Sequence, residues 1–96
     1  MTEKTMRTIT LDFTNCSHWM TFWHIIKEAY DFPDYFGNNL DALWDCLAYY
    51  DDEDIHTRVI GLNTLPNDYR NWIDGMIEIF DRVHELTPNM TFEVIS

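Results

Sequence analysis

Two carboxylates in the middle of the chain stand four positions apart, at Asp41 and Asp45. In a helix this spacing places them about 40° apart on one face, as adjacent side chains. Like charges at this spacing destabilise a helix by roughly 0.2–0.5 kcal/mol. No Lys or Arg between residues 37 and 49 offsets the repulsion. Two uncompensated acids on one face are suited to binding a cationic partner.

Aromatic side chains flank the two acids. Trp44 lies between them along the chain, and Tyr35 and Phe36 precede them in a loop that contains Gly37. Aromatic rings beside carboxylates are typical of a recognition surface. Helical spacing by itself favours a simpler interpretation, in which the two acids form a solvated face and the tryptophan belongs to the core. The apolar stripe of the same helix consists of leucines: Leu40, Leu43 and Leu47.

The charge of the whole chain points to the same region. Its 96 residues, enough for one domain (1–96), carry 17 acidic and 6 basic residues and a net charge of −11. Nine of the acids lie between residues 28 and 57, and no Lys or Arg accompanies them. This sign disfavours direct binding to nucleic acid or to an anionic membrane. With 46% hydrophobic residues the chain has material for a packed core, so we expect a folded, acidic domain.

Hydrophobic periodicity predicts the elements that position these residues. Residues 6–13 and 90–95 alternate as strands, and residues 57–62 form a short apolar strand. We expect the first helix to start near Asn15 or Ser17 and to end before Pro33. Its apolar stripe is Trp19, Phe22, Trp23, Ile26 and Tyr30. Asn39 is a good N-cap for a second helix that runs to Tyr50.

The order of these elements predicts the fold class. Residues 51–54 are four acids and are predicted to form a solvated loop, and residues 63–67 form a turn. A third long helix begins near Asn71 and ends before Pro88. Parallel strands joined by helical crossovers follow from this order, so we expect an α/β fold with a three-stranded parallel sheet covered by helices.

The remaining reactive residue types do not form a recognisable catalytic or metal-binding pattern. Cys16 and Cys46 make no CxxC motif and no disulfide framework, and no cofactor motif is present. The four histidines are dispersed, which disfavours an enzyme or a metal site. The first residues lack the apolar segment of a signal peptide, so we expect a cytoplasmic protein with free thiols.

One segment resembles a known family. Residues 32–47 read FPDYFGNNLDALWDCL, and this run closely resembles the signature of the barstar family of intracellular ribonuclease inhibitors. Length, acidity and element order agree with that family over essentially the whole chain. The resemblance implies a barstar-like fold, and it implies that the second helix and the loop before it occlude the active site of a ribonuclease.

The resemblance also implies roles for individual residues. Asp45 would take the position of a substrate phosphate, Asp41 would pair with a neighbouring cation, and Tyr35 would pack on a catalytic histidine. The remaining expected contact residues are Phe36, Gly37, Asn39, Leu40, Trp44 and Tyr50.

The chain departs from the family pattern at several positions. Phe36 stands where the family has a second tyrosine, so a hydroxyl contact is lost. The family uses a glutamate on its last long helix, whereas counting along this chain brings Arg82 near that position. The nearby acids that could replace it are Glu78, Asp81 and Glu85. The family's cysteine on the last strand is missing, and Cys46 is kept as an expected inert, partly buried thiol.

The leading hypothesis is an immunity protein that binds a basic ribonuclease toxin, as a monomer that forms a 1:1 heterodimer without a cofactor. The alternative is an acidic mimic of nucleic acid that blocks another nucleic-acid-binding protein. A mimic would spread its charge along a long face, whereas the signature concentrates it on Asp41 and Asp45. A plain interaction domain would bind its partner without Asp45.

Overall fold

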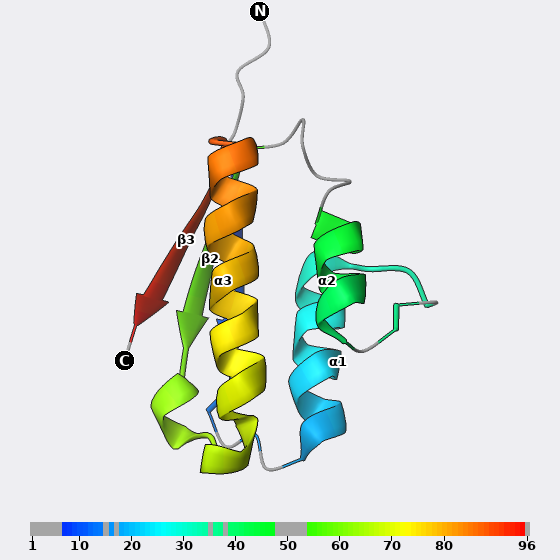
Figure 1. Cartoon of the computed structure of the whole chain (residues 1–96), viewed down its shortest axis with the longest axis vertical. Helices are drawn as coiled ribbons and strands as arrows, with labels where there is room; N and C mark the ends of the chain where they lie inside the picture. Colours follow the sequence, from blue (N-terminus) through cyan, green and yellow to red (C-terminus); the bar gives the residue numbers. More distant parts are fainter. Residues whose placement is uncertain are drawn as a thin grey trace, which may run out of the picture.

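A computed structural model describes residues 7–14, 16, 18–34, 36–37, 39–47 and 54–95. Helices separate the three strands along the described chain (Figure 1). They are β1 (Arg7–Asp12), α1 (Trp19–Tyr30), α2 (Leu40–Leu47), β2 (Ile55–Ile60), α3 (Arg70–Leu86) and β3 (Met90–Ile95), with 3₁₀ turns η2 (Leu62–Thr64) and η3 (Asn67–Tyr69) before α3.

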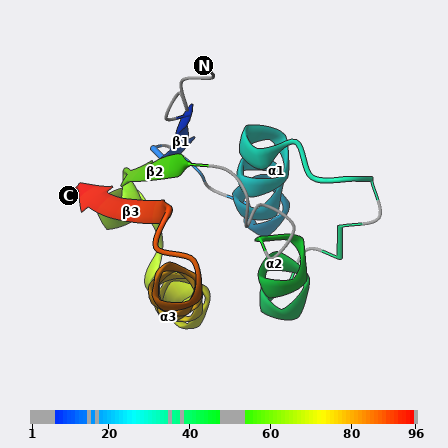
Figure 2. The same ribbon diagram turned by 90° about the horizontal axis from the view of Figure 1, so that it is seen from above.

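The three strands form one parallel sheet in the order β1-β2-β3. Seen from above, α1 and α3 lie on the same side of this sheet (Figure 2). α1 packs against β1, α3 packs against β3, and α2 packs against α3. The predicted α/β fold with a three-stranded parallel sheet is confirmed, and its helices cover one face.

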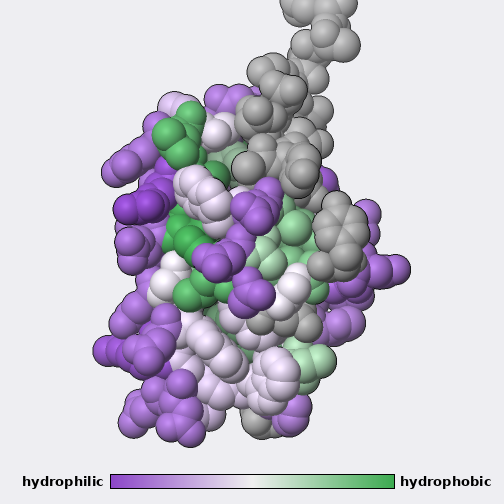
Figure 3. Space-filling view, turned by 45° about the vertical axis from the view of Figure 1, so that its right-hand side comes forward, coloured by the Kyte–Doolittle hydropathy of each residue, from purple (hydrophilic) through white to green (hydrophobic). Residues whose placement is uncertain are grey.

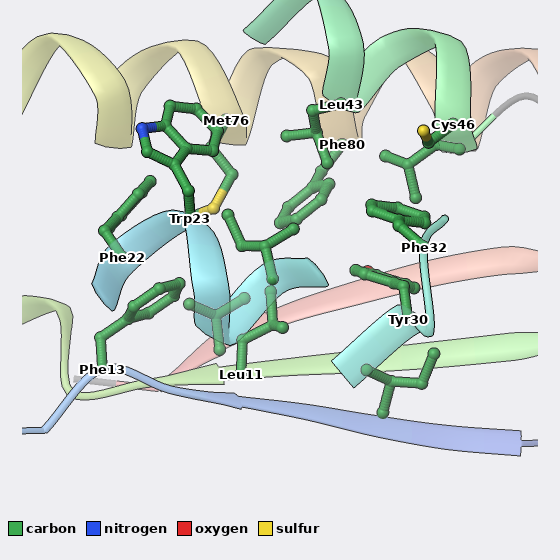
Figure 4. Packing of buried hydrophobic residues seen from close by; sticks show 14 of the residues in the cluster. Leu11, Phe13, Phe22, Trp23, Tyr30, Phe32, Leu43, Cys46, Met76 and Phe80 are labelled. Carbon is green, nitrogen blue, oxygen red and sulfur yellow. The ribbon is translucent and has the colours of Figure 1, made fainter. Parts of the chain in front are cut away.

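The buried side chains come from every layer of this arrangement (Figure 4). Leu11 and Phe13 rise from the first strand and its end to meet Phe22 and Trp23 of α1, and the rings of Phe13 and Phe22 stack with centroids 4.8 Å apart. On the central strand, the hydroxyl of the buried Thr57 shares a 2.6 Å hydrogen bond with the Tyr30 hydroxyl. This hydrogen bond joins β2 to α1 and leaves neither buried hydroxyl without a partner.

Several boundaries differ from the predicted ones for local reasons. β2 spans Ile55–Ile60, two residues earlier than predicted, because Gly61 takes a φ of 81° and turns the chain into η2. The cap of α1 is His18, whose Nδ1 accepts a hydrogen bond from the Met20 N–H at 3.2 Å. The predicted starting residues Asn15 and Ser17 lie outside the described residues. The first helix ends before Pro33 and the last strand spans Met90–Ile95, as predicted.

Trp19 belongs to the apolar stripe predicted for α1, but its end of the stripe is exposed. Its side chain is 47% exposed, whereas Phe22, Trp23 and Ile26 of the same stripe are buried. Trp19 is the first residue of the helix, and among the aromatic rings of other elements it approaches Trp72 of α3, with centroids 6.4 Å apart. Helical spacing predicts which face a residue shares, but not whether that end of the helix is covered.

Candidate functional site

The short helix α2 is held at its start by the side chain of Asn39. Its Oδ1 accepts a hydrogen bond from the Ala42 N–H at 2.8 Å, which satisfies a donor that the first helical turn leaves free. Its Nδ2 donates to the carbonyl oxygen of Gly37 at 2.9 Å. Asn39 therefore fixes the loop relative to the helix, which agrees with its prediction as the N-cap.

The two faces of α2 differ in polarity. Leu43, Cys46 and Leu47 are buried, while Asp41 and Asp45 are exposed. Trp44 is half-buried and borders both faces, as the helical wheel predicts. We call Asp41, Trp44 and Asp45 the acidic α2 face. Within the described residues neither carboxylate of this face takes part in an ion pair.

In the acidic segment of residues 28–57, one carboxylate pairs with a cation that precedes the segment. Lys27, directly before this segment, reaches across the turn after α1 and places its Nζ 3.2 Å from Oδ1 of Asp34. The absence of Lys and Arg between residues 28 and 57 therefore does not leave Asp34 without a cation, because Lys27, seven positions before it, reaches its carboxylate. Among the described acids of this segment, Asp31, Asp41, Asp45 and Asp54 take part in no ion pair.

An open groove of about 330 Å³ runs between α2 and α3. Leu40, Asp41 and Trp44 form one side of it, and Gly75, Glu78, Ile79 and Arg82 form the other. We call this hollow the α2–α3 groove. At Gly75 the helices approach so closely that a Cβ atom would collide with Cδ1 of Leu40. Sequence reasoning missed Gly75, although a glycine inside a helix is unfavourable and often marks close packing.

Phe36 differs from the other described residues of the predicted contact set because its side chain is buried. Phe36 is 6% exposed, and its ring lies 5.1 Å from Phe32 and 6.3 Å from Trp23. In this structure the apolar ring packs into the core and anchors the loop, and its expected contact with a partner stays a prediction. Tyr35 and Tyr50 lie outside the described residues, as do residues 51–53 of the acidic tract.

Comparison with known proteins agrees with this arrangement. The family model described as "Barstar (barnase inhibitor)" matches residues 6–94. This chain belongs to the barstar family. A curated Bacillus subtilis (strain 168) protein named "Putative ribonuclease inhibitor YrdF" is 33% identical over 81 residues, which cover 83% of this chain and 88% of that protein.

Within this barstar-family chain, α3 presents a mixed charge to the α2–α3 groove. Arg82 is 67% exposed and its Nε lies 3.9 Å from Oε1 of Glu78, a loose pair on one helix face. Asp81 lines a different hollow with His84, Thr91 and Phe92, on the side of α3 that faces β3. Of the acids near Arg82, Glu78 therefore shares the groove with Asp41, and Asp81 faces away from it.

Both thiols are buried and poorly reactive. Burial raises the pKa of Cys46, and the negative charge of the adjacent Asp45 raises it further. Burial likewise raises the pKa of Cys16, although its Sγ donates a hydrogen bond to the His18 carbonyl oxygen at 3.6 Å. A thiol reacts as its thiolate, so neither cysteine is poised as a nucleophile at neutral pH.

The histidines are distributed over several elements, where each has a structural partner. His18 caps α1, His24 lies near Glu28, and His56 lies between Thr91 and Glu93. His84 Nδ1 donates to the Met90 carbonyl oxygen at 2.8 Å. Among the described residues, no group of three or more potential ligands is placed to hold a metal ion. No helix in that part of the chain combines the length and apolarity needed to cross a membrane.

Proposed function

We propose that this protein is a ribonuclease inhibitor, and specifically a cytoplasmic immunity protein that occludes the active site of a cationic ribonuclease toxin in a 1:1 complex. Membership of the barstar family and the relative named as a ribonuclease inhibitor support the general role. The observation that carries the proposed binding mode is the acidic α2 face, where Asp41 and Asp45 are exposed and unpaired within the described chain.

The chemistry follows from what a ribonuclease active site must bind. Its cations converge on the phosphate of the RNA backbone, and a carboxylate can accept the same charge-assisted hydrogen bonds. Asp45 takes the place of the phosphate and Asp41 pairs with an adjacent cation. Because both carboxylates stand on a capped helix that packs against α3, little ordering is needed on binding. Unlike the RNA backbone, the inhibitor's carboxylate offers the enzyme no phosphodiester bond to cleave.

Other residues complete and support this contact surface. Trp44 contributes a half-buried ring next to both acids, and Leu40 contributes one wall of the α2–α3 groove. Gly37 and Asn39 bring the loop close to the partner, while Phe36 holds that loop from the core side. The predicted contacts of Tyr35 and Tyr50 remain part of the proposal on the resemblance alone.

The proposal is tested by neutralisation of RNA cleavage with three isosteric variants of equal charge. Asp41→Asn and Asp45→Asn alter the acidic α2 face, and Asp81→Asn removes the same charge from the side of α3 that faces β3. Leaving buried cations of the enzyme without a partner should weaken inhibition on the order of 100-fold for Asp45→Asn. Asp81→Asn should stay close to wild type. Full inhibition by both α2 variants would overturn the proposed binding mode.

The same set of variants addresses the alternative of a nucleic-acid mimic. A mimic relies on charge distributed along a surface, so Asp81→Asn should then weaken partner binding as much as Asp45→Asn does. Salt gives a second measurement, because association guided by opposite charges slows as ionic strength rises. An association rate independent of salt would contradict electrostatic steering towards the acidic α2 face.

A further inference from the structure

Two tryptophans form an exposed aromatic patch at the end of the molecule where α1 and α3 begin. Trp19 is 47% exposed, Trp72 is half-buried, and their rings lie 6.4 Å apart. We call these two residues the tryptophan patch. Large exposed apolar side chains are few among the described residues, and the others are Met20, Leu86 and Val94. Met20 directly follows Trp19 on α1.

The tryptophan patch adjoins the acidic α2 face. Trp72 lines an open hollow of about 240 Å³ together with Asp41, Asn39, Leu40 and Trp23. Asp41 and Leu40 also line the α2–α3 groove, so one surface leads from Trp44 past Asp41 to Trp72. Figure 3 shows pale side chains of near-neutral hydropathy gathered at the lower end of the molecule, where α1 and α3 begin in Figure 1.

The size of a typical protein interface shows why surface next to the acidic α2 face matters for binding. A stable complex buries about 800 Å² on each partner, which corresponds to a patch roughly 30 Å across. A helix of 8 residues such as α2 is only about 12 Å long. A partner seated on Asp41 and Asp45 must therefore cover neighbouring surface as well. Tryptophan and methionine are enriched at the centres of such interfaces.

Charge decides which partner fits the tryptophan patch. A second copy of this chain would bring a net charge of −11 against an equal charge, with Asp41 beside the contact. A cationic protein would instead be attracted by the same acids. We propose that the tryptophan patch is the apolar part of the ribonuclease-binding surface and receives apolar side chains from the rim of the enzyme's active site. This inference rests on the proposed function.

The test compares Trp19→Gln with Leu86→Gln. Leu86 is 72% exposed and is the last residue of α3, at the opposite end of that helix from Trp72. Both variants replace an exposed apolar side chain by the same polar one, so both should fold, which circular dichroism verifies. The probes are barnase and a panel of other cationic microbial ribonucleases. Affinity is measured by titration calorimetry, with Asp45→Asn as a third variant.

We expect Trp19→Gln to weaken binding of a ribonuclease that wild type binds by about 10-fold, and Leu86→Gln to leave it unchanged. If Asp45→Asn weakens binding and Trp19→Gln does not, the inference is overturned while the proposed function stands. If wild type binds none of the ribonucleases, the proposed function fails and the inference fails with it, whereas a lack of effect of Asp45→Asn alone would contradict the proposed role of Asp45. Sedimentation that shows self-association of wild type, abolished by Trp19→Gln, would assign the tryptophan patch to a second copy instead.

Discussion

Asn39 connects the loop and the helix of the proposed contact surface, and its replacement by alanine removes both connections. The Ala42 N–H then loses its acceptor at 2.8 Å, and the Gly37 carbonyl loses its donor at 2.9 Å. α2 has 8 residues, which is too short to be stable through backbone hydrogen bonding alone. The loss should therefore act mainly on α2.

The magnitude follows from the two hydrogen bonds. Loss of an asparagine N-cap costs about 1 kcal/mol, and loss of an exposed side-chain hydrogen bond adds about 0.5 kcal/mol. Asn39→Ala should therefore lower the free energy of unfolding by about 1.5 kcal/mol. For a domain of this size, that is a fall in Tm of roughly 6–12 °C. Asn39→Asp keeps the acceptor for Ala42 and loses only the donor, so it should cost about 0.5 kcal/mol.

Urea unfolding, followed by circular dichroism, measures these changes, and hydrogen exchange locates them. The control is Asn71→Ala, which changes an exposed asparagine in the first turn of α3 that has no side-chain hydrogen bond in the described structure. Amide protons of α2 should exchange faster in Asn39→Ala, while those of the sheet change less. If Asn39→Ala and Asn71→Ala unfold at the same urea concentration, the assignment of Asn39 as the cap is refuted.

Three further substitutions test single features of the fold. Asp31 follows α1 with a φ of 57°, so Asp31→Gly should raise the free energy of unfolding by about 0.5–1 kcal/mol in urea, because glycine adopts this conformation freely; a loss would contradict this. Gly75→Ala should lower the free energy of unfolding by about 1 kcal/mol, because the clash with Leu40 outweighs the gain in helix propensity. A gain would show that α2 can shift away at no cost. Hydrogen bonds from the hydroxyl and the backbone N–H of Thr14 lower the pKa of Asp12 below 3.8. This stabilisation is present above the ordinary pKa and is lost as pH falls through the lower folded-state value. The stability difference between wild type and Asp12→Ala should thus be constant at neutral pH and shrink below about pH 4, and a difference unchanged in acid would refute the assignment.

The sequence by itself determined the elements and the family. Alternation at residues 90–95 marks β3, and the helical spacing of Phe22, Trp23 and Ile26 marks the buried face of α1. Both patterns are local, because a strand repeats every two residues and a helix every 3.6. The position of Asp41 and Asp45 on one exposed face of α2 follows from the same periodicity. Such features need no knowledge of what packs against what.

The tertiary structure alone decided which side chains are covered and which charges are paired. Lys27 reaches Asp34 across a turn, and Gly75 admits Leu40 from another helix. Phe36 is buried beneath the loop, whereas Trp19 is left exposed next to Trp72. These outcomes depend on how the chain turns and on which elements pack together, which local periodicity does not encode. The boundary of the surface offered to a partner therefore emerges only when α1, α2 and α3 are assembled.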